Sequence, residues 1–480
     1  MTRWLPWLFL LCALPTGLGC AMLTPVGLFP DEPQHIARAD GLRYGEILGV
    51  PAPIQFPGMT TRAGVMMNTG IFNVLLAKEF PEAFPDKPVS AAARRATDAV
   101  PWDNRMTYCP TLMTQYFPAF YIPAALGLLA GQKIGLSPLH TVYLGRVAAL
   151  LAFLAMGFAA LALARQGQAL LFAVLTLPTV VNLASSYNQD GLMIGACVLA
   201  AALLTRPPAK PRAAWLAALG LLVAVGCAKL PYAALMLFCL LPLRAPGLWR
   251  RGWLTALACA LPALWLLHTL QAGLLVHYAR APYHPGPLWP GPRDIWLSSV
   301  VPADNLRVLL AHPVQILLLP LVTLRAFWST TWPLILGGIS SGNVRIWPWE
   351  YAPLAVALSV AALGALRPWP NGNGRGADAG LAAVVLFITL IGIEISMYLA
   401  FTNAGLPFIE GINARYFLPL LPFCVFILPW AGGWLARLPV AEQILALPAA
   451  CFAVPALLMA AVNSVALPIY VFHLFHMPGP

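Results

Sequence analysis

Charge is scarce in this chain. Of its 480 residues, 9% are Asp, Glu, Lys or Arg and 60% are hydrophobic. A soluble protein carries roughly 25% charged residues, so the composition excludes an ordinary soluble domain and predicts an all-α, polytopic membrane protein. The net charge of +11 does not indicate nucleic acid, because the basic residues are dispersed among apolar runs and form no basic stripe.

The usual signatures of soluble chemistry are also missing. The sequence has no P-loop, no G-x-G-x-x-G after a strand, no H-E-x-x-H and no G-x-S-x-G, which leaves no nucleotide or hydrolase motif. None of the eight His pairs with another at ligand spacing, so no metal ligand is assigned and a divalent-metal requirement stays open. The nine Cys include no C-x-x-C pair, and most lie in apolar runs, where Cys acts as a small packing residue.

Long apolar runs are abundant, and hydropathy predicts about eleven transmembrane helices. The first runs from Trp4 to Leu28, with no charge between Arg3 and Asp31. Its beginning resembles a secretory signal, but the run continues beyond signal length, so we expect an uncleaved helix. The other spans are expected at 139–164, 168–185, 191–205, 213–229, 231–243, 253–275, 351–366, 381–402, 415–436 and 443–465.

Short basic connectors give the expected orientation. With the first long loop outside, one side of the membrane holds two acidic residues and eleven basic ones: Arg3, Arg165, Arg206, Lys210, Arg212, Arg244, Arg250, Arg251, Arg367, Arg375 and Arg437. The positive-inside rule makes that side cytoplasmic. We therefore expect a bacterial inner-membrane protein with a cytoplasmic N-terminus and a periplasmic C-terminus.

The expected organisation is one membrane domain over residues 1–480. It contains a first extracytoplasmic loop at 29–138 with short helices near 70–78 and 122–134, and a second large extracytoplasmic region at 276–350. Transmembrane helices fill 351–480. The apolar stretch 312–333 is expected to be interfacial or re-entrant, because a single crossing there would place Arg367 on the wrong side.

Four ionisable residues follow the first apolar run: Asp31, Glu32, His35 and Arg38. Charged groups beside hydrocarbon are costly and are commonly functional. The alternative is a flanking anchor, for which one charge would suffice. This cluster is the first candidate site.

Four motifs carry a resemblance. They are P-D-E-x-x-H-x-x-R-A at 30–39, an acidic second loop at 186–190, Lys-x-Pro-Tyr at 229–232 and G-x-x-x-R-Y-x-x-P-L at 411–420. The first resembles the acidic motif of GT-C-type glycosyltransferases, and the whole set resembles a large bacterial family of uncharacterised polytopic membrane proteins. This chain departs from that pattern at Ala414, where Gly is usual, and at Gln189, where Ser would be expected.

The GT-C resemblance implies transfer of a sugar, with inversion, from a polyprenyl-phosphate carrier to an envelope hydroxyl at the outer face. The partners would be membrane lipids, the lipid-linked sugar and envelope polysaccharide machinery. Asp31 would be the general base, Glu32 would orient the acceptor or exchange roles with Asp31, and Asp190 would stabilise positive charge on the sugar. The leaving phosphate and the sugar would be bound by residues that include Arg415, Arg38, Lys229, His35, Tyr232 and Tyr416.

Other interpretations stay open for several of these residues. Asp190 could cap the helix that begins near Gly191, Lys229 could be a snorkelling interfacial residue, and Arg415 could pair with Glu410. Glu394 stands alone within a span, where it could line a polar cavity or be a packed, protonated carboxyl.

Two other functions also remain open. A lipid or polysaccharide transporter or flippase would use Glu394 as its coupling residue, although the chain shows no paired halves. A non-catalytic envelope-assembly protein would use its outer loops to bind partners.

Overall fold

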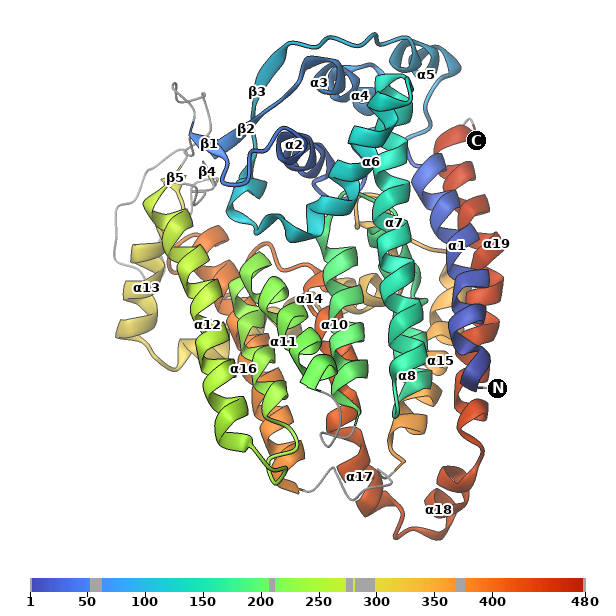
Figure 1. Cartoon of the computed structure of the whole chain (residues 1–480), viewed down its shortest axis with the longest axis vertical. Coiled ribbons are helices and arrows are strands. Elements are labelled where there is room, and N and C mark those ends of the chain that lie inside the picture. The colour runs from blue at the N-terminus through green and yellow to red at the C-terminus, as the bar shows by residue number, and fades with distance from the viewer. Residues whose placement is uncertain are drawn as a thin grey trace.

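The structure is a helical bundle with a polar cap at one end (Figure 1). It is a computed structural model that describes residues 2–51, 63–206, 212–272, 279–280, 298–367 and 376–477. The bundle is the apolar part expected from composition, since its outward surface is rich in exposed Leu, Val and Trp. A mostly helical membrane protein is therefore confirmed. The cap adds a small sheet that the all-α class did not include.

Five helical segments of the described chain are long and apolar enough to cross a membrane. They are α1 (Leu5–Leu23), α7 (Pro138–Leu163), α12 (Leu248–Gln271), α16 (Gly376–Phe401) and Cys451–His476, which contains α19 (Val454–His476). Three bent pairs raise the number to eight if each is one span: α9 (Pro178–Ala184) with α10 (Gln189–Leu204), α13 (Pro302–Ala311) with α14 (Gln315–Gly337), and Ala414–Phe426 with α17 (Leu428–Leu435).

The expected eleven spans are therefore not confirmed. Several segments counted from hydropathy form elements too short to cross alone. These are α8 (Gln168–Leu175), the 3-10 helix η4 (Leu230–Leu240) and α15 (Tyr351–Ala365). Helix α11 (Arg212–Ala228) has 17 described residues, at the lower limit of spanning length. The stretch 312–333 lies mostly in α14, which bends by 108° from α13, a geometry shared by broken spans and re-entrant loops.

The cap is built from the first loop. Its helices are α2 (Glu32–Arg43), α3 (Thr69–Leu76), α4 (Glu79–Ala83), α5 (Ala91–Asp98) and α6 (Ile122–Lys133), so helices lie where they were expected near 70–78 and 122–134. The unexpected element is an antiparallel sheet of β1 (Val50–Pro51), β2 (Ala63–Asn68) and β3 (Met106–Pro110). Asp40 of α2 accepts a hydrogen bond from the backbone N–H of Asn68, which joins α2 to this sheet.

Hydrogen bonds show which chain segments share an end of the bundle. The Gln166 side chain donates to the carbonyl of Arg367, so two of the basic connectors lie together. In Figure 1 this end also carries α17 and α18 (Pro439–Ala446), opposite the cap. At the cap end, Val89 N–H donates to the carbonyl of Phe475 near the end of α19. The C-terminal helix thus ends beside the first loop.

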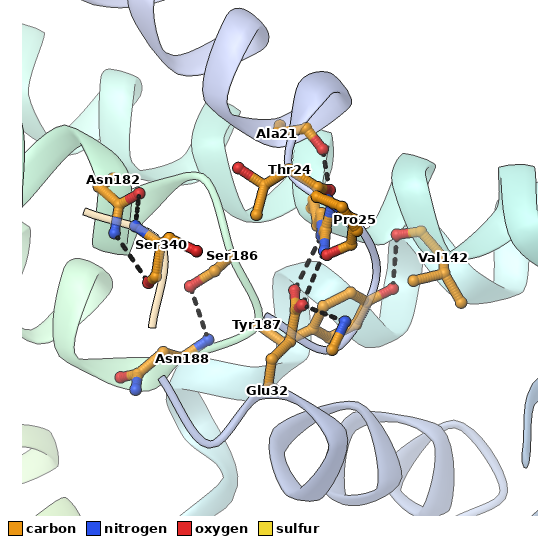
Figure 2. Close-up of polar contacts among 12 residues, drawn as sticks. Ala21, Thr24, Pro25, Glu32, Val142, Asn182, Ser186, Tyr187, Asn188 and Ser340 are labelled. Carbon is orange, nitrogen blue, oxygen red and sulfur yellow. Dashed lines mark hydrogen bonds and ion pairs between the residues drawn. The ribbon is translucent and has the colours of Figure 1, made fainter. Parts of the chain in front are cut away.

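The second large region is only partly described. Residues 273–278 and 281–297 lie outside the described chain, between α12 and a short strand pair, β4 (Ala279–Arg280) with β5 (Ser298–Ser299). After α14 comes a hairpin of β6 (Gly338–Ile339) and β7 (Val344–Arg345). Asn182 of α9 accepts a hydrogen bond from Ser340 N–H, which holds this hairpin against the bundle (Figure 2).

Candidate functional site

Asp31 occupies the turn that opens α2. Its φ of 55° is left-handed, a conformation that costs free energy in most residues other than Gly, that Asp adopts more readily than most, and that clusters at functional sites. The Asp31 carbonyl accepts hydrogen bonds from Gln34 and His35 N–H, which fixes the first turn of α2. The Asp31 side chain remains 48% exposed, although most of α2 is buried.

Arg415 joins two carboxylates that are distant in sequence. Its Nη2 donates to Asp31 Oδ2 at 2.8 Å, and its Nε lies 3.1 Å from Asp190 Oδ2. Lys229 Nζ donates to the other oxygen of Asp190 at 2.5 Å. These four side chains form a continuous, formally neutral ionic chain, which we call the ionic cluster: Asp31, Arg415, Asp190 and Lys229.

The second loop positions Asp190. Asn188 caps α10, because its Oδ1 accepts a hydrogen bond from Asp190 N–H at 2.8 Å. This assigns the capping role to Asn188 and leaves the Asp190 carboxylate for Arg415 and Lys229. The Asn188 amide also donates to the Pro30 carbonyl at 3.0 Å, which ties the second loop to the residue before Asp31.

The 3-10 helix η6 (Ala414–Tyr416) positions Arg415 in a similar way. Asn413 caps it, with its Oδ1 accepting a hydrogen bond from Arg415 N–H. The Tyr416 ring lies beside both cations, with Lys229 Nζ 4.5 Å and Arg415 Cζ 5.4 Å from its centroid. Tyr232 donates from its hydroxyl to the Tyr416 carbonyl at 2.7 Å. The carboxylates that Arg415 contacts are therefore those of the candidate site rather than Glu410.

A cavity of about 530 Å³ opens at the ionic cluster. This is the size range of pockets that hold a small molecule. Seven of the expected site residues line it: Asp31, His35, Asp190, Lys229, Tyr232, Arg415 and Tyr416. Residues from four separate parts of the chain thus meet at one cavity.

Electrostatics keep Asp31 ionised. Burial alone would raise the pKa of its carboxyl, but the positive charges of Arg415 and Lys229, with the hydrogen bond from Arg415, hold that pKa below its usual value. Asp31 is therefore a carboxylate at neutral pH. It is also a weaker base than a free Asp while Arg415 remains bound to it.

His35 is a neutral member of the cavity wall. It is 2% exposed, and burial lowers its pKa to about 4 against the opposing effect of Asp31 and Asp190. Its Nδ1 lies 2.7 Å from the hydroxyl of Tyr121, a partner that no sequence motif indicated. A neutral imidazole here can exchange hydrogen bonds without adding charge to the ionic cluster.

Glu32 points away from this cavity. Its two oxygens accept hydrogen bonds from Arg146 Nε and Nη2 at 2.8 and 2.7 Å, and both side chains are fully buried. Arg146 also donates to the carbonyls of Ala21, Thr24 and Pro25 at the end of α1 (Figure 2). Glu32 therefore connects α1, α7 and α2, which differs from the acceptor-orienting role expected for it.

Arg38 also has a structural position. Its guanidinium donates to the carbonyls of Glu46 and Ile47, at 3.0 and 2.7 Å, and holds the loop after α2. It is not among the described residues that line the cavity, which differs from the expected phosphate contact. Among the described residues, no group of three or more His, Cys, Asp or Glu side chains is placed to hold a metal ion.

Arg146 is the main structural residue that sequence reasoning missed. Its signal was present, because it is the only charged residue within the 139–164 span, and an intramembrane charge requires a partner. Tyr121 and Asn188 carried no comparable signal. Both are recognisable only from the three-dimensional packing of the loops.

A comparison with known protein families identifies the family of this chain. No curated protein and no solved structure matches the chain. A family model described as "Predicted membrane protein (DUF2142)" matches residues 14–424, a range that includes the whole ionic cluster. The resemblance to an uncharacterised family of polytopic membrane proteins is therefore confirmed, and the chain belongs to the DUF2142 family.

Proposed function

We propose that the protein is a GT-C-like membrane glycosyltransferase. It moves a sugar, with inversion, from a polyprenyl-phosphate carrier to a hydroxyl group of an envelope acceptor. The observation that supports this most directly is the meeting of Asp31, Asp190, Arg415 and Lys229 at one cavity. Two carboxylates serve the acceptor and the sugar, and two cations serve the phosphate.

The donor phosphate would bind to Arg415 and Lys229. Both line the cavity, and a guanidinium offers two donors to phosphate oxygens. Both cations are neutralised by carboxylates, so an incoming phosphate must displace one of these carboxylates. Asp31 is 48% exposed and Asp190 only 5%, which makes Asp31 the carboxylate that can be released.

This exchange would activate the base. Arg415 lowers the pKa of Asp31, so transfer of Arg415 to the phosphate raises that pKa and increases the basicity of the carboxylate. The base would become strong only when a donor is bound. Premature removal of a proton from the acceptor is thereby disfavoured.

Sugar transfer takes place in a single step, in which one bond to the anomeric carbon forms as another breaks. Asp31 accepts the proton of the acceptor hydroxyl, whose oxygen bonds to the anomeric carbon. The bond from that carbon to the phosphate oxygen breaks, and its electron pair leaves with polyprenyl phosphate, which Arg415 and Lys229 stabilise. Asp190 remains ionised beside the sugar and stabilises the oxocarbenium-like charge.

Apolar residues give the carrier a place beside these charges. Pro262, Trp265 and Leu266 of α12 and Ile393 and Met397 of α16 line the same cavity. Helix α12 is largely exposed on its outer surface, as expected for a helix that faces lipid. A prenyl chain can therefore lie between lipid and the ionic cluster.

The orientation that we propose places the cap outside an inner membrane. Basic connectors near Arg165, Arg367 and Arg437 would lie in the cytoplasm, in accordance with the positive-inside rule. Polyprenyl-linked sugars presented at the outer face would then enter from the cap side.

Analysis of lipid-linked glycans in a deletion strain tests the function. The strain should accumulate the unused lipid-linked sugar and lack the modified envelope acceptor. The wild-type chain and Asp98→Asn, a change at a 55% exposed carboxylate of the cap, should restore the product, whereas Asp31→Asn should not. Full restoration by Asp31→Asn would contradict the enzyme and favour a transporter.

A further inference from the structure

Tyr121 and His35 form a buried pair beside the ionic cluster. The hydroxyl of Tyr121, which is fully buried, lies 2.7 Å from His35 Nδ1, and the two stacked rings have centroids 5.6 Å apart. Among the described residues, this Nδ1 is the one partner of the hydroxyl. A buried hydroxyl group donates its hydrogen where an acceptor is present. Tyr121 therefore donates to Nδ1, and the proton of the neutral imidazole lies on Nε2.

His35 Nε2 is thus an N–H donor in the wall of the cavity at the ionic cluster. The His35 side chain is 2% exposed and lines this cavity, and the described residues offer Nε2 no acceptor. A buried donor without an acceptor is costly. An oxygen atom of a molecule in the cavity would complete its hydrogen bonding.

Two side-chain amides of the same cavity repeat this arrangement. Gln34 Oε1 accepts a hydrogen bond from Leu112 N–H at 3.2 Å. Asn413 Oδ1 accepts one from Arg415 N–H, also at 3.2 Å. Because a backbone N–H can only donate, each bond identifies the oxygen of the amide and leaves its NH2 group on the other side. Both side chains line the cavity, and neither NH2 group has a partner in the described part of the chain.

A second cavity, of about 360 Å³, shares Phe401 and Gly411 with the first. Glu394 lines it, which agrees with one of the two alternatives that the sequence left open. Its described lining includes none of the three donor side chains. These donors therefore belong to the cavity in which the donor phosphate would bind.

We propose that His35, Gln34 and Asn413 form a sugar subsite that binds the hydroxyl groups of the donor sugar. This assignment rests on the proposed function, because it gives the class of sugar that the polyprenyl phosphate carries. A hydroxyl oxygen accepts hydrogen bonds from N–H groups, whereas a protonated amino group has no lone pair with which to accept them. The subsite therefore favours a sugar with free hydroxyl groups over one with amino groups at the contacted positions.

Calorimetric titration of the purified full chain tests the subsite with lipids of equal charge. Polyprenyl methyl phosphate presents the phosphate diester without a sugar, and the polyprenyl phosphates of glucose, mannose and galactose present it with one. At least one sugar lipid should bind about tenfold tighter or more than the methyl diester, the scale of two or three neutral hydrogen bonds. Binding of none of the four lipids would contradict the proposed function and the subsite with it, whereas equal binding of all four would contradict the subsite alone.

Variants then locate the contact. His35→Phe combined with Tyr121→Phe removes both members of the buried pair, so neither is left without its partner. It should reduce the gain from the sugar by about fivefold or more and leave the affinity for the methyl diester within about twofold. His140→Phe, at a 54% exposed ring, should change neither affinity. If the double variant does not fold, Asn413→Ser provides the same comparison, because Ser can still cap Arg415 N–H while the NH2 group is lost.

Replacement of single hydroxyl groups tests the sugar class. On the sugar that binds most tightly, an amino group in place of a ring hydroxyl should reduce the gain at one or more positions. Amino derivatives that all bind as tightly as the parent sugar would overturn the inference. A gain that survives in the folded double variant and in Asn413→Ser would overturn it as well.

Discussion

Arg415 donates a 2.8 Å hydrogen bond to Asp31, although 384 residues separate the two in sequence. The same guanidinium contacts Asp190, so one side chain, from the chain that follows α16, joins the first loop to the second loop. Changes at Arg415 should therefore affect ligand binding and the titration of Asp31 together.

Arg415→Gln should weaken binding of polyprenyl phosphate by about tenfold or more, because the phosphate loses a charged, two-donor partner. Arg415→Lys keeps the charge and should lose less. Calorimetric titration of the purified protein with polyprenyl phosphate provides the measurement. Arg437→Gln, at an exposed site next to α17, is the control, and equal affinity in Arg415→Gln would remove Arg415 from the donor site.

Asp31→Asn should reduce sugar transfer by roughly 100-fold or more, the scale expected for loss of a general base. The fold should persist, because Asn has nearly the same shape. Asp40→Asn is unsuitable as a control, since Asp40 is buried in an ion pair with Arg43. Asp98→Asn is suitable, and the two variants are compared by radiolabelled sugar transfer in membranes.

Glu32→Gln should lower the folding stability of the protein and should not act directly on sugar transfer. It breaks a fully buried pair with Arg146, and loss of one partner in such a pair costs about 3–5 kcal/mol. Asp304→Asn disrupts the exposed pair with Arg307 and should have little effect. Detergent extraction followed by size-exclusion chromatography at increasing temperature should show early aggregation of Glu32→Gln alone; an unchanged profile would argue against an anchoring role.

His35 should make stability depend on pH. Its pKa is about 4 when folded and 6.5 ordinarily, so between these values the unfolded chain takes up a proton that the folded protein excludes. The contribution of neutral His35 to the free energy of unfolding is complete above about pH 6.5. It is lost as pH falls, by roughly 2 kcal/mol at pH 5.

The comparison for this prediction is His35→Gln, measured by thermal unfolding at pH 7.5 and pH 5. The variant should lose less stability on acidification than the wild type. The stability change of the variant must be subtracted from that of the wild type, because a second group titrates in the same range. Burial raises the pKa of Asp40 to about 6, and protonation of Asp40 favours the folded state as pH falls. His140→Gln, at a 54% exposed ring, should behave like the wild type; identical pH dependence in His35→Gln would exclude the imidazole as the cause.

Labelling with a membrane-impermeant maleimide tests the orientation. In intact spheroplasts Asp98→Cys should react, whereas Arg437→Cys, at an exposed position of the connector after α17, should react only after lysis. Cys109 should contribute little background, because burial raises the pKa of its thiol to about 11. The reverse pattern would place the cap and the ionic cluster in the cytoplasm, where the proposed donor is not presented.

Much of the candidate site was predictable because its residues fall in short polar motifs between apolar runs. Asp31, Asp190, Lys229 and Arg415 each stand at such a boundary, and the structure places all four at one cavity. Neighbouring residues in the same motif were harder to assign. Glu32 and Arg38 lie on sides of α2 that do not face the cavity, and the motif alone does not reveal which side of the helix each residue occupies.

The fold was predictable in class and less so in detail. Composition identified a helical membrane protein, but hydropathy does not register bends, and it merged the short helices α8 and α9 into one expected span at 168–185. The cap sheet was missed because β2 reads Ala-Gly-Val-Met-Met-Asn, without the polar–apolar alternation that predicts a strand. Pairing with β3 supplies the stability that local propensity lacks.

Gly411 has a φ of 76° and lies where the two cavities meet. A Cβ atom at this position would overlap the ring of Phe401 and the end of Met397. A side chain at position 411 would push the Phe401 ring out of a wall that both cavities share, so a Gly411→Ala change should alter the shape of both at once.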